Sequence, residues 1–310
     1  MTLLQTMYYI IYGFFYLVSL LPFFILYGIA DIIFVVMFYL VGYRKEIVMN
    51  NLQHAFPEKS LPELKSIRRR FFRNFIDNWI ETIKLLSISK RQLNKRITGD
   101  FAVFETLHKT GVSVQANLGH FFNWEIMTLH AGINQPYTFL TVYLPQSSKI
   151  FDRLLQDIRG RWGNPLLPSS EMARALIPWR KKQYLLALGA DQSPPTPDNG
   201  YWLYFMNRPA AFPKGPEKFA RSQNIPVVMM TTTRPKRGHY HFKYFLLSAD
   251  PKALPDGELI REYVSHLEEN LREQPDLYLW SHRRWKLQWI PEYAHLWVDE
   301  KPMPSTNTIS

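Results

Sequence analysis

The sequence predicts an α/β fold with a mainly parallel central sheet flanked by helices, preceded by an N-terminal transmembrane helix. Short apolar runs at residues 112–116, 184–190 and 226–232 are typical of buried strands. Helical patterns alternate with these runs, as they do in folds whose parallel strands are joined by helices. Residues 7–43 contain a single Asp, Glu, Lys, Arg or His, namely Asp31, which indicates a membrane segment.

The apolar N-terminal run can hold one spanning helix with an interfacial piece, or a tight pair of helices broken near Pro22. Arg44 and Lys45 follow the run directly, so the positive-inside rule places the rest of the chain in the cytoplasm. A single span leaves the N-terminus on the other side. We expect Asp31 to lie near the membrane interface, where a carboxylate costs little.

Length and composition narrow the class of protein. A chain of 310 residues without cysteine can bury a sizeable core but excludes disulfides and thiolate catalysis. The net charge of +11 and the 15% of aromatic residues predict a polyanionic partner, and the apolar N-terminus favours a membrane surface over nucleic acid. We therefore divide the chain into a membrane anchor (residues 1–43), one cytoplasmic domain (44–300) and a disordered tail (301–310).

A capping box begins the first long helix after the anchor. Residues 60–63 read Ser-Leu-Pro-Glu, in which Ser and Glu satisfy free backbone N–H groups and Pro suits the first turn. The helix is predicted to run to about Leu86 on an apolar stripe of Leu64, Ile67, Phe71, Phe75, Trp79 and Ile83. Its early part carries Arg68, Arg69, Arg70 and Arg73. Each arginine alone is typical of a solvated face, but the cluster beside an anchor is expected to contact anionic headgroups.

Residues 117–125 read NLGHFFNWE and follow a predicted strand. His120 falls on the strand-to-helix turn, to which Gly119 gives backbone freedom, and Glu125 falls in the first helical turns. Their side chains can then converge. A carboxylate on one imidazole nitrogen fixes the tautomer and leaves the other nitrogen free to accept a proton. This is the chemistry that activates a hydroxyl nucleophile.

The middle of the chain continues the alternation of strands and helices. Strands are predicted at residues 137–143 and 184–190, and helices at residues 149–162 and 170–180. Ligands bind at the ends of such strands, and both His120 and Asp191 fall at strand ends.

Residues 191–213 are predicted to form a long loop, because they are rich in Pro and Gly before a group of aromatic residues. We interpret the aromatic group as an entrance that faces the membrane. The alternative is that these side chains simply pack over the domain.

The C-terminal third is predicted to contain helices at residues 214–224 and 257–272, and a strand pair (226–232 with 240–247) across a basic turn. Beyond them, YLWSHRRWKLQW mixes Arg283, Arg284 and Lys286 with three tryptophans. Such mixing favours a surface against phosphate and lipid, and the alternative is a partly buried ion-pair cluster.

Several common motifs are absent. The sequence has no Walker loop, no GxGxxG, no HExxH and no GxSxG nucleophile elbow. His239 and His241 alternate along a predicted strand without an acidic or cysteine partner at ligand spacing, so we expect exposed histidines and no metal site. The chemistry inferred from His120 needs no metal and no redox cofactor.

The H-x4-E spacing in NLGHFFNWE is similar to the H-x4-D/E motif of membrane acyltransferases. Together with MNNLQHAFPEKS, LGADQSPP and WSHRRWK, it makes nearly the whole chain resemble the late lipid A acyltransferases, which decorate lipopolysaccharide precursors. The resemblance implies a glycerolipid acyltransferase-like fold at the bacterial inner membrane, with the catalytic domain facing the cytoplasm. It implies an O-acyltransferase in which His120 is the general base and Glu125 orients it.

The resemblance also implies partners. The expected acyl donor is the acidic acyl carrier protein (or acyl-CoA), to which a chain of net charge +11 can dock, and the expected acceptor is a phosphorylated glycolipid of the lipid A type. The long loop would then admit the acyl chain. Substrate contacts are implied for Asn123, Arg161, Asp191, Gln192, Arg283 and Arg284.

Two alternatives remain open at this point. Phe122 stands where related sequences often have a small residue, so the acceptor could be another lipid, such as a lysophospholipid or an aminoacyl lipid. The chain could also be a non-catalytic membrane protein that binds lipid. The presence of both His120 and Glu125 favours an enzyme.

Overall fold

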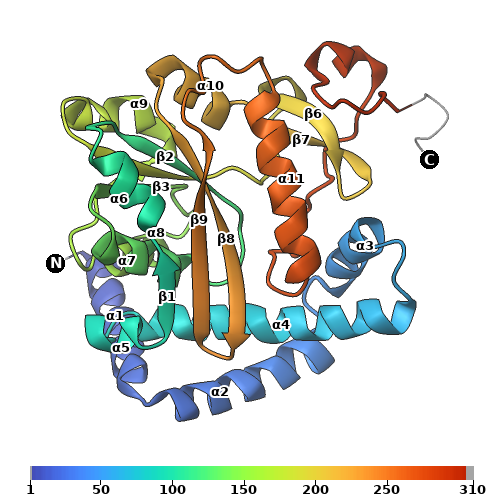
Figure 1. The fold of residues 1–310 in the computed structure, drawn as a ribbon. Helices are drawn as coiled ribbons and strands as arrows, with labels where there is room; N and C mark the ends of the chain where they lie inside the picture. Colours follow the sequence, from blue (N-terminus) through green and yellow to red (C-terminus); the bar gives the residue numbers. More distant parts are fainter. Residues whose placement is uncertain (1, 305–310) are drawn as a thin grey trace.

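A computed structural model describes residues 2–304 and contains a seven-stranded sheet, which helices flank (Figure 1). The strand order is β1-β9-β8-β2-β5-β3-β4, and every neighbouring pair is parallel except β8 and β9. The strands are β1 (Ile97–Asp100), β2 (Val114–Leu118), β3 (Thr138–Tyr143), β4 (Leu166–Pro168), β5 (Tyr184–Gly189), β8 (Val227–Lys236) and β9 (His239–Ser248). The predicted α/β fold with a mainly parallel sheet is confirmed, and the antiparallel pair is the hairpin predicted across the basic turn.

The apolar N-terminus forms two helices. These are α1 (Leu3–Leu20) and α2 (Phe23–Val35), which continues as a π-helical turn, η1 (Val36–Val41). The break falls at Leu21 and Pro22, near the predicted position, and both helices pack against α4 (Leu61–Lys84). Both helices are long and apolar enough to cross a membrane, judged by length and composition.

Helix α4 (Leu61–Lys84) begins with the predicted capping box and lies alongside α2 (Figure 1). Its predicted apolar stripe is largely buried, because it packs against α2 and the rest of the domain. Trp79 departs from the stripe: its side chain is 46% exposed. Arg70 and Arg73 are each about half exposed.

Most of the remaining helices lie around the sheet (Figure 1). These remaining helices are α3 (Lys45–Ala55), α5 (Lys90–Asn94), α6 (Ala102–His108), α7 (Trp124–Asn134), α8 (Lys149–Arg159), α9 (Met172–Ala175), α10 (Gly215–Gln223) and α11 (Glu258–Glu273). The helix predicted at residues 170–180 is only the four-residue α9 between two 3-10 turns. Pro178 explains the difference, because proline cannot continue an α-helix.

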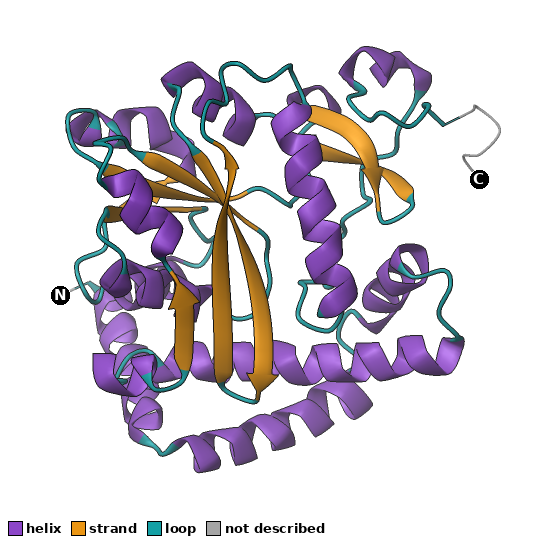
Figure 2. Cartoon of the chain, in the orientation of Figure 1, coloured by secondary structure: helices purple, strands orange, loops and turns teal. Residues whose placement is uncertain are grey.

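The long loop predicted for residues 191–213 is wrong in its second half. Strands β6 (Gly200–Phe205) and β7 (Arg208–Pro213) form an antiparallel hairpin, which lies apart from the large sheet in Figure 2. Its two turn residues, Met206 and Asn207, have φ of 46° and 69°, as a tight hairpin turn requires. Tyr201, Trp202, Phe205 and Met206 are buried. The aromatic residues therefore pack over the domain, and the predicted membrane-facing entrance at this place is a misinterpretation.

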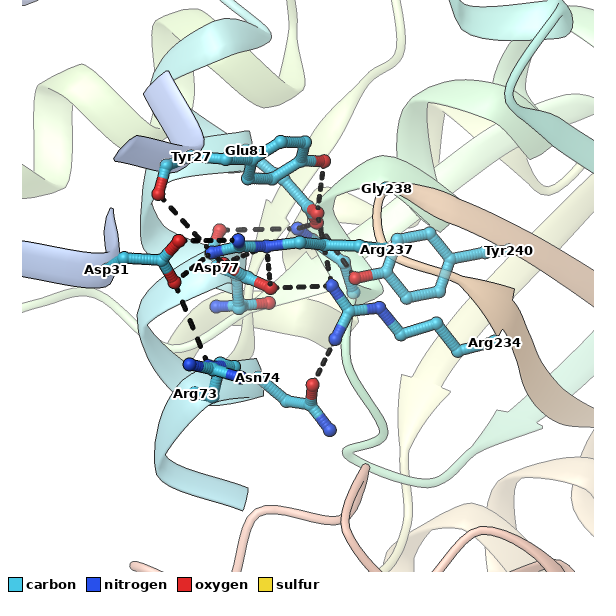
Figure 3. Close-up of polar contacts among 12 residues, drawn as sticks. Tyr27, Asp31, Arg73, Asn74, Asp77, Glu81, Arg234, Arg237, Gly238 and Tyr240 are labelled. Carbon is cyan, nitrogen blue, oxygen red and sulfur yellow. Dashed lines mark hydrogen bonds and ion pairs between the residues drawn. The ribbon is translucent and has the colours of Figure 1, made fainter. Parts of the chain in front are cut away.

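Asp31 has a partner that its place in an apolar helix does not reveal. It binds Arg237, from the β8–β9 turn, at 3.0 Å, and it lies 3.7 Å from Arg73 of α4. Arg237 in turn binds Asp77 of α4, which is only 1% exposed (Figure 3). These contacts tie α2, α4 and the β8–β9 hairpin together. The predicted tail from Lys301 falls mainly on residues 305–310, which lie outside the described residues.

Replacing Asp77 by Asn is expected to destabilise the fold by about 3 kcal/mol, because it removes the buried carboxylate that Arg234 and Arg237 share. Chemical unfolding in detergent would measure the loss. Asp256→Asn is the matched control, since Asp256 also pairs with an arginine but is 74% exposed, and it should cost about 1 kcal/mol or less. Equal losses in both variants would show that the buried network contributes no special stability.

Candidate active site

His120 and Asp191 meet at one edge of the sheet. His120 follows β2 and Asp191 follows β5, and these strands are parallel neighbours whose last residues, Leu118 and Gly189, are paired. The His120 Nδ1 atom lies 2.5 Å from Asp191 Oδ1, and the backbone N–H of His120 donates to Asp191 Oδ2 at 2.8 Å. Asp191 is fully buried, whereas the His120 side chain is 26% exposed. The carboxylate therefore fixes the ring from the protein side.

This contact decides the protonation of both groups. Burial lowers the pKa of His120, but the charge of Asp191 and the hydrogen bond to it prevail and raise the pKa above its usual 6.5. Burial raises the pKa of Asp191, but the charge and hydrogen bonds of His120, with Arg284, prevail and lower it. With Nδ1 bound to Asp191, His120 has Nε2 as its free basic atom, and no described residue donates a hydrogen bond to it.

Two glycines allow close packing at the site, one beside the His120 ring and one beside α11. A Cβ atom at Gly189 would lie 2.7 Å from His120 Cε1, so a side chain on the last residue of β5 would displace the imidazole. A Cβ atom at Gly119 would lie 2.7 Å from a methyl group of Leu267. Gly119 is thus required for close packing against α11, and its φ does not lie in the left-handed region where glycine freedom is needed.

The predicted contact between Glu125 and His120 is not made. Glu125 lies in the first turn of α7, and Arg159, the last residue of α8, binds both of its oxygens, through Nε at 2.8 Å and Nη2 at 2.5 Å. Trp124 Nε1 donates to the same carboxylate at 3.0 Å. Glu125 is 4% exposed, so the bidentate arginine compensates its charge in a buried place. Its charge still favours the protonated form of His120 through space.

Asn123 and Phe122 hold the motif in place. Asn123 is fully buried; its side-chain oxygen caps α7 by accepting from the N–H groups of Glu125 and Ile126, and its amide donates to Glu81. Phe122 is equally buried against aromatic rings of α4. The predicted substrate contact of Asn123 has no support in this geometry, because all of its polar atoms bind the protein.

Arg161 needs a similar correction. Its Nη1 donates to the backbone carbonyls of Leu85 and Ile88 at 2.6 Å each, and it does not line the cavity beside His120. Arg159, two residues earlier, does line that cavity, as does the predicted substrate residue Gln192.

The two arginines of WSHRRWK have different environments. Arg283 is exposed. Arg284 is 2% exposed, with its guanidinium 4.0 Å from the centre of the Phe212 ring and Nη1 3.3 Å from Ser193 Oγ. The prediction of a surface arginine is wrong for Arg284. Its buried charge lowers the pKa of Asp191, so it acts on the His120 pair from inside the protein.

A cavity of about 340 Å³ lies in front of His120. Its polar wall includes Glu125, Arg159 and Gln192. Its apolar wall is larger and includes Trp79, Trp124, Met127, Leu144 and Leu155. An imidazole that can accept a proton thus faces a space suited to a hydrocarbon chain. Across residues 2–304, no group of three His, Asp or Glu side chains could hold a metal ion.

Sequence reasoning missed two features of this site. The role of Asp191 beside His120 had a signal, because both residues end buried strands, but only the strand order shows that these strands are neighbours. Arg159 had a weaker signal. It is four residues after Leu155 on α8, and both line the cavity, as residues at this spacing share one helix face.

One comparison with known protein families found a match. A family model described as "Bacterial lipid A biosynthesis acyltransferase" matches residues 1–287, which is most of the chain. No curated protein matches the chain significantly in sequence.

Proposed function

Because the chain belongs to the bacterial lipid A biosynthesis acyltransferases, we propose that it moves a fatty acyl chain from a thioester to a hydroxyl group of a lipid A precursor, with His120 as the general base. The observation that carries the proposal is the His120 imidazole, held at Nδ1 by the buried Asp191 and facing a largely apolar cavity. The matched family is an acyltransferase family.

The proposed reaction begins at the free nitrogen of His120. Nε2 takes the proton from the acceptor hydroxyl as its oxygen attacks the thioester carbonyl carbon. The oxygen–carbon bond forms and the carbonyl becomes a tetrahedral oxyanion. The intermediate then expels the thiolate, which takes the proton from His120, so the products are an ester and a free thiol. Asp191 stabilises the imidazolium that exists between these two proton transfers.

Arg159 is the proposed donor to the oxyanion. Glu125 occupies its Nε and Nη2 atoms, while Nη1 has no acceptor among residues 2–304. A cation fixed by a bidentate contact needs little reorganisation when charge develops beside it. We thus propose that Glu125 serves the reaction by holding Arg159, while Asp191 serves it by holding His120.

The proposed location is the cytoplasmic face of the inner membrane. Helices α1 and α2 and the continuation η1 expose many large apolar side chains, among them Leu3, Ile10, Phe24 and Leu40, which lipid tails would cover. Arg44 and Lys45 follow directly, which favours the cytoplasmic side. The net charge of +11 favours the acidic acyl carrier protein as donor.

A transfer assay tests the proposal. Full-length protein in detergent would be given an acyl carrier protein thioester or the acyl-CoA, with either a phosphorylated lipid A precursor or a lysophospholipid as acceptor. We expect acyl transfer to the lipid A precursor, with faster turnover from the carrier protein. Transfer to the lysophospholipid alone would replace the proposed acceptor, and absence of transfer with every pair would contradict the proposed reaction.

Replacing Arg159 by Gln is expected to lower kcat by roughly 10²-fold, because the charged donor to the oxyanion is lost. The matched control is Arg161→Gln, two residues away and directed at backbone carbonyls outside the cavity, which should keep a kcat near that of the wild type. Steady-state kinetics of both variants, with thermal melting to establish folding, would check this. A larger loss of kcat in a folded Arg161→Gln variant than in Arg159→Gln would assign the role of oxyanion donor to Arg161 instead.

A further inference from the structure

A second cavity, of about 360 Å³, lies at the seam between α4 and the β8–β9 hairpin, and it shares no lining residue with the cavity of His120. The proposed acyl transfer uses none of its residues. Its wall carries five cationic side chains: Arg70, Arg73, Arg234, Lys236 and Arg237. Mutual repulsion among five cations around one cavity can be offset by neighbouring carboxylates or by an anionic ligand.

The carboxylates do not fully balance the cations. Asp77 and Asp276 belong to the wall, while Asp31 and Glu81 reach its arginines from α2 and α4. With all four carboxylates ionised, five cations still leave one positive charge. The cavity therefore has a net positive charge even when all four carboxylates are ionised.

The cations divide into paired and available groups. Arg237 is saturated: its guanidinium binds Asp31 at 3.0 Å and Asp77 at 2.6 Å, and Figure 3 shows it between the two carboxylates. Arg73 approaches Asp31 only through Nε at 3.7 Å, and Lys236 makes no ion pair within the described part of the chain. Arg234 is 9% exposed, and its Nε is buried without a hydrogen-bond partner among these residues. Arg73 and Lys236 thus retain accessible donors, while Arg234 contributes a largely buried positive charge.

The cavity lies next to the apolar N-terminal helices. Asp31, which binds Arg237 of the cavity wall, belongs to α2. Phe24 and Ile32 of α2 and Leu40 of its continuation η1 are each exposed by two thirds or more. Lipid tails that cover these apolar side chains would place the opening of the neighbouring cavity at the level of the lipid headgroups. Phosphate groups are concentrated at that level, and the arginine fork matches their oxygens.

We propose that this cavity binds the phosphate group of an anionic membrane lipid, with Arg73 and Lys236 as its accessible contacts and Arg234 beneath them. The Asp31–Arg237–Asp77 contacts hold α2 against the cavity wall, so the membrane-facing helix and the headgroup site move as one unit. The bound lipid is a component of the surrounding membrane and is separate from the molecule that is acylated at His120.

The test uses full-length protein in detergent, titrated with dioleoylphosphatidylglycerol or dioleoylphosphatidylcholine and followed by native mass spectrometry. We expect the wild type to retain phosphatidylglycerol in preference to phosphatidylcholine. Arg73→Gln combined with Lys236→Gln should weaken the apparent affinity for phosphatidylglycerol roughly 30-fold, which corresponds to about 1 kcal/mol for each cation. The Arg73 side chain is half exposed and Lys236 is exposed, so the double variant should keep its fold. Thermal melting would check this.

The matched control is Lys218→Gln combined with Lys252→Gln. It removes the same charge from exposed positions on and next to α10, at the opposite end of the molecule from α2 (Figure 1), and should leave retention of phosphatidylglycerol unchanged.

Equal retention by the cavity variant and the wild type would overturn the proposal, as would an equal loss in the control. Complete displacement of the lipid by inorganic phosphate would identify a free phosphate site instead and would also overturn it. An increase in KM for the acceptor without loss of phosphatidylglycerol would assign the cavity to the acceptor, again contradicting the proposal. Lipid retention requires no turnover, so this result is independent of the proposed reaction.

Discussion

Replacing His120 by Ala is expected to lower the rate of acyl transfer by roughly 10²- to 10⁴-fold, the usual cost of losing a general base. No other histidine near this place is a ready substitute among the described residues: the chain has no cysteine, and burial lowers the pKa of both His130 and His282 to about 4. The fold should persist, because Asp191 still accepts the hydrogen bond from the backbone N–H of residue 120. The positive charge of Arg284 also still stabilises the Asp191 carboxylate.

Single-turnover transfer from an acyl carrier protein thioester to the lipid hydroxyl would measure this loss. His120→Gln provides a second variant, because glutamine can still bind Asp191 but cannot accept a proton, and it should be equally slow. His266→Ala is the control for removing a histidine, since His266 pairs with Glu269 on the surface of α11. A folded His120→Ala variant with near-normal turnover would refute the mechanism.

Replacing Asp191 by Asn is expected to lower kcat by roughly 10²- to 10⁴-fold, as happens when the carboxylate that holds a catalytic histidine becomes an amide. The amide can keep a contact with Nδ1 but cannot stabilise the imidazolium, and it can select the wrong tautomer. Thermal melting should separate this effect from unfolding, because Asp191 is fully buried.

The pH dependence gives this second prediction its sharpest measurement. His120 acts only when neutral, so kcat/KM rises with pH through the His120 pKa, and pairing with Asp191 places that rise above the usual 6.5. In Asp191→Asn the acid limb should move to lower pH, because the imidazolium loses its main stabilising charge. Glu125→Gln should shift the limb less, since Glu125 acts on His120 only through space. A larger shift in Glu125→Gln would restore the direct role that the H-x4-E spacing suggests for Glu125.

Local patterns in the sequence were sufficient for much of the fold. The alternation of apolar strands and amphipathic helices predicts the mainly parallel sheet, Ser60 and Glu63 mark the start of α4, and Pro22 marks the break between α1 and α2. Each of these features depends on neighbours in the sequence, through period, capping or backbone restriction. His120 is found in the same way, since its place at the end of an apolar strand is a local property.

The aromatic segment after Asp191 shows where local patterns fail. Its composition resembles an open loop, yet it forms the β6–β7 hairpin, and Trp202 becomes fully buried. Burial of those side chains depends on the elements packed over them, among them the turn at residues 291–296. The sequence of the hairpin by itself does not show which distant residues will cover it.

The pairing of charged side chains was decided only by the tertiary structure. Strand order places β5 beside β2, so Asp191, 71 positions after His120, reaches the imidazole, while Glu125, five positions after it, turns to Arg159. The same applies to Asp31, whose partner Arg237 lies 206 positions away. Periodicity determines which face of each element is buried, and so the sequence by itself determined the class of fold and the place of His120 at the end of a strand. Which carboxylate meets which cation depends on the order and register of elements far apart in the chain, because an ion pair forms only where packing brings the two groups within a few ångströms.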